Sequence, residues 1–167
     1  MNEAANRIWI CGRGGQGVQF LAELLNGVFF AEKKQSWMQA SCDWAIRGGQ
    51  VVARVFADSN PQSQWAPSTD YNLLISLYPA SPPPLPPLAE NALILDAVKS
   101  GAYALAHQKG ALRALNLLML GQLLAQYPLC SEDVVAWVLK QKLGPSRFKD
   151  MPVNLDMLEL GTHLGRS

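Results

Sequence analysis

The stretch RIWICGRGGQGV, residues 7–18, decides the predicted fold of this chain. Its first half, Arg7 to Cys11, is apolar and rich in β-forming residues, which is typical of a strand buried on both faces. After Gly17 the apolar residues take the spacing of a helix that packs one face against a core; they are Val18, Leu21, Leu25, Val28 and Phe29. The sequence therefore predicts a strand, a glycine loop and a helix in direct succession.

Further strands are predicted downstream of this unit. Apolar runs indicate them at residues 36–42, 50–57, 71–78 and 92–98. Residues 58–69 are rich in Ser, Pro, Gln and Asn, so they read as a loop. The prolines of residues 81–87 predict an extended connector, because stacked prolines cannot join a helix or the interior of a sheet.

The last third of the chain is predicted to be helical. One helix is expected from about residue 111 to 127, and a second from its N-cap Ser131 to about residue 143. Asn154 is the expected N-cap of a final helix, with Gly161 at its C-cap. We therefore expect residues 1–167 to form a single three-layer α/β/α domain, with a mostly parallel or mixed sheet and a helical C-terminal segment.

The composition limits the possible classes of function. Only 16% of the residues are charged, against an average of about 25%, which fits either a large core or a surface covered by a partner. A net charge of +1 without a basic stripe argues against nucleic acid as a partner. No apolar run reaches the ~18 residues that cross a bilayer, and the first residues do not resemble a signal peptide. We expect a cytoplasmic protein without a membrane partner.

The cysteines give no sign of a metal centre. Cys11, Cys42 and Cys130 are far apart in the sequence and form no CxxC pair. A disulfide framework, a zinc site and a self-contained iron–sulfur cluster all require closer or paired spacing. We expect three reduced thiols and no metal ligands in this chain.

The loop Gly12-Arg13-Gly14-Gly15-Gln16-Gly17 is the first candidate site. It satisfies G-x-G-x-x-G between a strand and a helix, where bare backbone and a helix N-terminus favour an anion. A nicotinamide or flavin dinucleotide would also require an acidic residue about 20 positions later, and neither Glu32 nor Asp43 is well placed. The alternative is purely structural: the glycines only allow close packing of the helix against the strand.

A second candidate is the triplet Arg47-Gly48-Gly49 before the strand at residues 50–57. It could present a guanidinium and bare backbone to an anion, or it could be a turn with a solvated arginine. Asn116 lies on the apolar face of its predicted helix, so its amide either fixes the packing or faces a site.

Together these blocks resemble a known family. Ile8, Ile10 and the residues from Gly12 to Val18, then Arg47 to Gly49, Asn116 to Gly121 and Asn154 to Gly161, occur in the order of the gamma subunit or gamma domain of 2-oxoacid:ferredoxin oxidoreductases. Such enzymes oxidise pyruvate, 2-oxoglutarate, ketoisovalerate and other branched-chain 2-oxoacids, or indolepyruvate, to an acyl-CoA and reduce ferredoxin.

The resemblance implies an enzyme subunit that is inactive alone. Thiamine diphosphate with Mg and the iron–sulfur clusters would belong to alpha, beta and possibly delta partner subunits. The gamma part is associated with coenzyme A, which makes Gly12, Arg13, Gly14, Gly15, Gln16, Gly17, Arg47, Gly48 and Gly49 the expected cofactor-binding residues, with no catalytic residue in this chain. Two features depart from the family pattern: Ala45 stands where a glutamate is usual, and residues 78–116 are short and carry a proline run.

Two other functions remain open from the sequence. One is a stand-alone dinucleotide-binding domain for NAD or FAD that uses the same glycine loop. The other is a non-catalytic scaffold derived from the gamma fold, which the departures at Ala45 and in the middle of the chain would suit.

Overall fold

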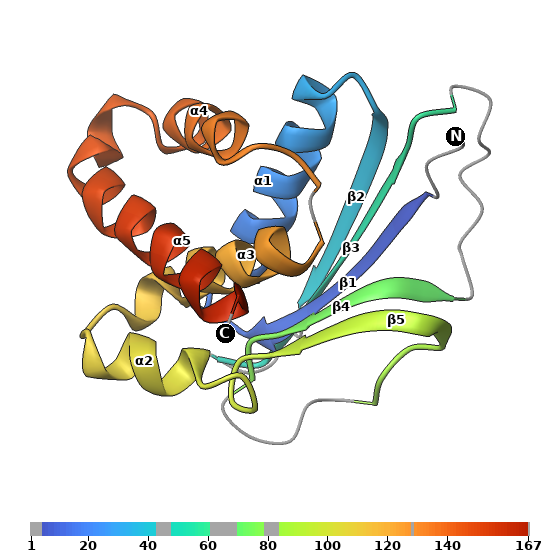
Figure 1. Cartoon of the computed structure of the whole chain (residues 1–167), viewed down its shortest axis with the longest axis horizontal. Helices are drawn as coiled ribbons and strands as arrows, with labels where there is room; N and C mark the ends of the chain where they lie inside the picture. The colour runs from blue at the N-terminus through green and yellow to red at the C-terminus, as the bar shows by residue number, and fades with distance from the viewer. Residues whose placement is uncertain (1–4, 43–47, 61–69, 79–83, 128, 167) are drawn as a thin grey trace.

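A five-stranded sheet forms the frame of the protein (Figure 1). The computed structural model describes residues 5–42, 48–60, 70–78, 84–127 and 129–166. In the order of the sheet the strands are β2 (Gln35–Cys42), β3 (Gln50–Asp58), β1 (Asn6–Arg13), β4 (Tyr71–Ser76) and β5 (Leu88–Asp96). Strands β1, β4 and β5 are parallel, whereas β3 is antiparallel to both β1 and β2.

The helices of the described chain gather on one face of this sheet (Figure 1). They are α1 (Val18–Ala31), α2 (Ala102–Gln108), α3 (Leu115–Gln126), α4 (Glu132–Leu143) and α5 (Met151–Arg166), with short 3-10 turns at Leu112–Ala114 and Pro145–Asp150. Helix α1 packs on β1, β2 and β3, α4 packs on α1, and α5 packs on α3. We call this side of the sheet the helical face, and the side that carries Trp9 and Cys11 the opposite face.

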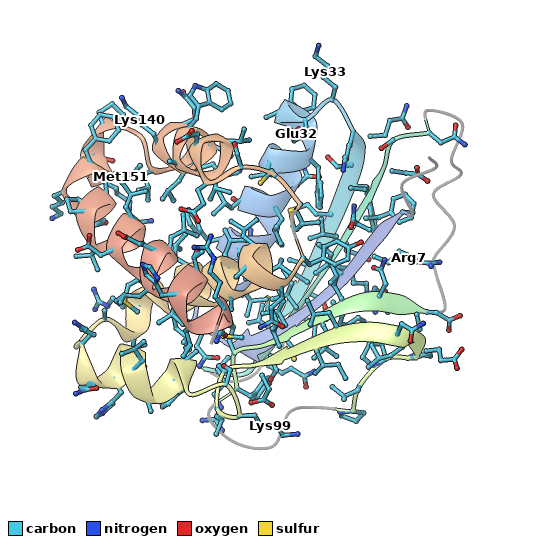
Figure 2. The ribbon with its side chains drawn as sticks, in the orientation of Figure 1. Arg7, Glu32, Lys33, Lys99, Lys140 and Met151 are labelled. Carbon is cyan, nitrogen blue, oxygen red and sulfur yellow. The ribbon has the colours of Figure 1, made fainter. Side chains whose placement is uncertain are left out.

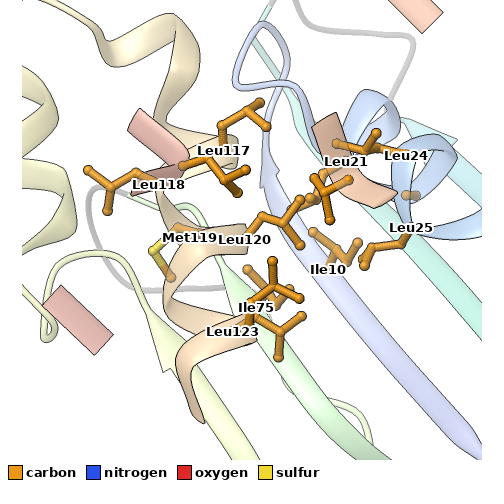
Figure 3. Close-up of a cluster of buried hydrophobic side chains, with 14 of the residues drawn as sticks. Ile10, Leu21, Leu24, Leu25, Ile75, Leu117, Leu118, Met119, Leu120 and Leu123 are labelled. Atoms are coloured by element: carbon orange, nitrogen blue, oxygen red, sulfur yellow. The ribbon is translucent and has the colours of Figure 1, made fainter. Parts of the chain in front are cut away.

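The main core lies between the helical face and helices α1 and α3 (Figure 3). Ile10 and Ile75 come from the sheet, Leu21 and Leu25 from α1, and Leu120 from α3, and all five are at most 1% exposed. Helix α3 is buried at every position from Leu115 to Leu124, because α5 covers the side that does not face the core. This enclosure holds the start of α3 close to the start of α1.

The predicted class is confirmed: the described residues form a single α/β domain with a mixed sheet and a helical C-terminal segment. The described helices, however, lie on one face of the sheet, whereas an α/β/α arrangement implies both. Strand β5 begins four residues earlier than predicted. Helix α2 was not predicted, since its seven residues bury only Ala102 and Ala106 and give almost no periodic signal.

The predicted caps of the last helix are wrong. Helix α5 starts at Met151 and ends at Arg166, so Asn154 and Gly161 both lie inside it. The Asn154 side-chain amide donates to the carbonyl oxygen of Asp150 at 2.9 Å, one turn back. Gly161 lies where α5 crosses α3, and a Cβ there would collide with the backbone of Leu118. The glycine is therefore needed for helix packing and does not end the helix.

Other local predictions agree with the structure where it describes them. Ser131 caps α4, with its hydroxyl oxygen accepting from the N–H of Val134 at 3.4 Å. Residues 84–87 of the proline-rich connector form neither helix nor strand, while residues 81–83 and most of the loop at 58–69 lie outside the described residues. No helix in the described ranges is both long and apolar enough to span a membrane.

Candidate functional site

The glycine loop joins the carboxyl end of β1 to the first turn of α1. Strand β1 ends at Arg13 and α1 begins at Val18, with Gly17 in the N-cap position. Because β4 and β5 run parallel to β1, their carboxyl ends meet the loop at the same edge of the sheet. Open α/β sheets bind their ligands at this edge.

The side chain of Gln16 fills the inside of the loop. Its Oε1 accepts from the backbone N–H of Arg13 at 2.6 Å, and its Nε2 donates to the carbonyl oxygen of Leu77 at 2.8 Å. The N–H of Gln16 also donates to the carbonyl of Arg13 at 3.0 Å. One side chain thus closes the loop on itself and ties it to the segment after β4. Sequence reasoning had given Gln16 no separate role.

Two glycines supply backbone geometry that the loop requires. Gly17 has a φ of 75°, in the left-handed region that favours glycine. A Cβ at Gly12 would lie 2.7 Å from Val18 Cγ2 and 3.2 Å from Leu77 Cβ, so helix α1 packs directly on the end of β1. The packing explanation for the glycines is therefore correct for Gly12, and it does not exclude a ligand elsewhere in the loop.

The start of α1 leaves backbone donors available. The N–H groups of Val18, Gln19 and Phe20 have no acceptor within the helix, as in any first turn, and Gly17 provides no side-chain cap. No acceptor for them is found among the described residues. These free donors make the first turn electropositive and suited to an anion. Arg13, four residues before Gly17 in the same loop, is exposed.

The second predicted block lies against the first. The N–H of Gly14 donates to the carbonyl of Gly49 at 2.9 Å, and a Cβ at Gly14 would lie 3.4 Å from the Cα of Gly48. The antiparallel pairing of Arg13 with Gln50 explains this approach, because it places the residues before β3 beside the residues after β1. Arg47 itself lies outside the described residues.

Asn116 connects the loop to α3. The residue is 3% exposed, and its Nδ2 donates to the carbonyl of Gly17 at 3.3 Å. A Cβ at Gly17 would collide with this amide, so a glycine there lets α3 approach the start of α1. Of the two roles that the sequence left open for Asn116, the geometry supports the structural one: it holds the N-cap of α1 in place.

A group of partly polar side chains lies next to the loop on the opposite face. Cys11, Val52 and Tyr78 pack together there. Burial raises the pKa of the Cys11 thiol, and burial also raises that of the Tyr78 hydroxyl. The positive charge of Arg13 partly offsets the rise in the pKa of Tyr78, so the guanidinium lies near enough to Tyr78 to act on it electrostatically.

The topology differs from that of a dinucleotide-binding unit. In that unit the strand after the first helix pairs directly with β1 and ends in an acidic residue near the ribose. Here β3 lies between β2 and β1 and runs antiparallel to both, so the end of β2 is a full strand further away. The N–H groups of Arg13 and Gly14 are already bonded within the protein, which leaves fewer donors for a pyrophosphate.

The described residues offer no metal ligand set: no three His, Cys, Asp or Glu side chains come together in them. Cys11 is buried, Cys130 is partly buried and Cys42 is exposed. Burial raises the pKa of the Cys130 thiol to about 11. A thiol that stays protonated at neutral pH is a poor metal ligand.

Comparison with known proteins identifies relatives of the sequence and of the fold. Residues 7–95, just over half of the chain, match the family model for pyruvate ferredoxin/flavodoxin oxidoreductase. A search of curated proteins gives no match. The fold is similar to 2-oxoglutarate:ferredoxin oxidoreductase from Magnetococcus marinus, solved with 2-oxoglutarate, coenzyme A and succinyl-CoA bound, with a TM-score of 0.79 and 16% identity.

The share of each relative that this chain covers is informative. The match to the Magnetococcus structure covers 98% of this chain but only 31% of that one, so this chain spans about a third of that polypeptide. A pyruvate oxidoreductase subunit from Thermotoga maritima matches over 96% of this chain and 97% of its own, at TM-score 0.72 and 17% identity. The gamma subunit of a keto/oxoacid ferredoxin oxidoreductase from Geobacter sulfurreducens matches over 96% of this chain and 98% of its own, with a TM-score of 0.66 and 15% identity.

Proposed function

The chain belongs to the pyruvate ferredoxin/flavodoxin oxidoreductase family, and on that premise we propose that it is the gamma subunit, or gamma-type domain, of a 2-oxoacid:ferredoxin oxidoreductase. Its role is to support the oxidative decarboxylation of a 2-oxoacid to an acyl-CoA, and it is inactive alone. The observation behind this proposal is that three hydrogen bonds hold the glycine loop. Its residues bond to the carbonyl oxygens of Leu77 and Gly49 and to the side-chain amide of Asn116. A loop held so firmly keeps the donors at the start of α1 fixed.

The glycine loop is the proposed contact for coenzyme A. Phosphate groups bind well to the free N–H groups of a helix start and to guanidinium groups. In this chain the donors of the first turn of α1 and the side chain of Arg13 would hold a phosphate, with Gly15 leaving the backbone bare beside them. Arg47, which adjoins Gly48 in the sequence, is the proposed second guanidinium.

Partner subunits carry the remaining chemistry in this proposal. Thiamine diphosphate with Mg would supply the carbanion chemistry at the 2-oxoacid, and iron–sulfur clusters would pass electrons to ferredoxin. The partners are the alpha, beta and possibly delta subunits, and the 2-oxoacid is chosen by surfaces outside this chain.

Purification of the chain from its native host tests the proposal. We expect it to co-elute with larger subunits that contain thiamine diphosphate and show iron–sulfur absorbance, and to lack oxidoreductase activity once separated. Elution as a lone monomer or homodimer would contradict the subunit assignment. The isolated chain should show no saturable micromolar binding of NAD(H), NADP(H) or FAD, because Gln16 and Gly49 already occupy two of the loop's donors.

A further inference from the structure

The outer edge of β2 lacks the features that protect sheet edges. This strand forms one end of the sheet order and pairs over all eight residues with β3, without a bulge. Gln35–Cys42 contains no charged residue and no proline; charged residues adjoin it only beyond its two ends, at Lys33 and Lys34 before it and at Asp43 after it. Natural edge strands usually avoid pairing with another chain through charges, prolines, bulges or short length.

The other end of the sheet shows the usual protection. Strand β5 carries Glu90 on its exposed side and follows two prolines, Pro86 and Pro87. Its pairing with β4 is interrupted by a register shift between Tyr71 and Leu73. The two edges of one sheet therefore differ, and only β2 presents a long, regular, uncharged edge.

On the opposite face of the sheet, a row of side chains runs from β2 across β3 to β1. The register aligns Gln39 with Arg54, and Arg54 with Trp9. The Arg54 guanidinium carbon lies 5.0 Å from the centroid of the Trp9 ring, and Tyr71 meets Trp9 edge-on at 5.2 Å. Trp37, on the same face of β2, is 45% exposed. Tryptophan, tyrosine and arginine are the residues that contribute most at protein interfaces.

The charge on this surface is unbalanced. Arg54 is exposed, and among the described residues no carboxylate lies within ion-pair distance of it. Its contact with Trp9 does not neutralise the guanidinium. A carboxylate on a partner that covers this surface would complement the charge of Arg54. A second copy of the chain added at this edge would bring no carboxylate from its own β2, which has no acidic residue.

We propose that the outer edge of β2, together with Trp37 and Arg54, binds an extended segment of the partner subunit, which adds a strand to the sheet. The segment would place an apolar side chain against Trp37 and a carboxylate near Arg54. This inference rests on the proposed function. A larger partner is supported by the Magnetococcus relative, in which the fold of this chain is 31% of one polypeptide.

Hydrogen–deuterium exchange on the isolated chain and on the purified complex measures the added strand directly. Within the described part of the chain, no strand pairs with the N–H groups of β2 that point away from β3. They should exchange about tenfold more slowly, or slower still, in the complex, while those of β5 change little. If β2 amides exchange at the same rate in both samples, the docking edge is wrong and the proposed function is unaffected.

Two exposed substitutions test the side chains, each with a matched control on the helical side. Trp37→Ser and Arg54→Glu should reduce the partner subunits recovered with the chain by at least about tenfold. Trp137→Ser, at a tryptophan of α4 that is 58% exposed, and Lys140→Glu, on the same helix (Figure 2), should leave recovery unchanged. Circular dichroism of each variant shows whether it is folded, and the exchange experiment needs no variant.

The outcomes separate the two claims. Loss of recovery with the α4 controls, and normal recovery with the β2-side variants, would overturn the inference in favour of the helical side. If no partner subunit is recovered with the wild-type chain, the proposed function is contradicted and there is no partner segment to occupy the edge of β2. A homodimer with protected β2 amides would mean that a second copy occupies the edge, and the inference as stated would be wrong.

Discussion

At the scale of single residues, Gln16 determines the shape of a loop that otherwise consists mainly of glycine. Its side chain accepts from Arg13 and donates to Leu77. Glycine backbones are free to move unless such contacts hold them. Gln16 therefore ties the loop to Leu77, 61 residues away, in addition to the bonds that Gly49 and Asn116 make with it.

Gln16→Glu should destabilise the protein. A carboxylate can still accept from Arg13, but it cannot donate to the carbonyl of Leu77 and would face it with a second oxygen. We expect the free energy of unfolding to fall by about 1–3 kcal/mol, read from the midpoint of urea unfolding. Gln141→Glu, at an exposed position of α4, is the control and should change little. Equal midpoints for both variants would mean that Gln16 does not hold the loop.

Arg13→Ala should weaken the use of coenzyme A by the assembled enzyme. Arg13 is an exposed residue of the glycine loop, so its loss would remove one charge-assisted contact with a phosphate at the proposed site. We expect KM for coenzyme A to rise roughly tenfold with little change in kcat, and a further rise when Arg47→Ala is added. Steady-state kinetics over a range of coenzyme A concentrations measure this.

The control for that experiment is Lys140→Ala, on α4 (Figure 2). It removes an equal charge from an exposed position on a different element. If KM for coenzyme A is unchanged in Arg13→Ala, or rises equally in the control, the loop has no direct part in binding this cofactor and serves only packing.

At the scale of elements, the crossing of α3 and α5 explains the two C-terminal sequence blocks. Gly121 and Gly161 face each other across the crossing, and a Cβ at either would collide with backbone of the other helix. This close contact encloses α3 and keeps Asn116, at its first turn, against Gly17. The two blocks therefore act on the glycine loop through packing.

Gly161→Ala should be strongly destabilising. The added methyl group meets the backbone of Leu118, which cannot rotate away as a side chain can. We expect a loss of about 2–3 kcal/mol in unfolding free energy, measured by thermal or urea unfolding. Gly27→Ala is the matched control, because its Cβ would meet side-chain atoms and no backbone: Val138 Cγ1 at 2.8 Å and Lys142 Cε at 3.6 Å. The gain in helix propensity there offsets the contact, so the change should stay within about 1 kcal/mol.

A small effect of Gly161→Ala would contradict the crossing geometry. It would mean that the two helix backbones can separate enough to accept a methyl group at Gly161. The same comparison therefore tests both the packing of α5 and the reason why its cap was predicted incorrectly.

At the scale of the whole molecule, the placement of the described helices on one face gives the protein two different sides (Figure 1). The helical face is covered by a large core, whereas on the opposite face the described residues form a small cluster around Cys11. The low charged fraction fits both parts of this arrangement. A deep one-sided core uses apolar residues, and large side chains such as Trp37 and Ile94 remain partly exposed.

Sequence reasoning worked where the signal is local. The strand, glycine loop and first helix lie within 26 neighbouring residues, from Asn6 to Ala31, and the strand and the helix each have their own periodicity. The cap of α4 at Ser131 is equally local. Gly161 was misread because a glycine near the end of an apolar pattern is typical of a helix C-cap, and only the neighbouring helix reveals the other reason for a glycine there.

The candidate site divides in the same way. Its residues, from Gly12 to Gly17 and at Gly48 and Gly49, were identified from their order along the chain and their resemblance to a family. That Gly49 accepts from Gly14, and that Asn116 lies on Gly17, depends on contacts between residues 35 and 99 positions apart. No periodicity links such residues, because their proximity is fixed by how strands and helices pack.

The sequence by itself determined that a strand, a glycine loop and a helix open this protein, because backbone freedom at glycine and the spacing of apolar residues act over a few residues. Only the tertiary structure decided that β3 separates β2 from β1, that the described helices share one face, and that Gln16 occupies the loop. These features come from strand order and side-chain packing, which depend on the whole chain reducing its exposed apolar surface together.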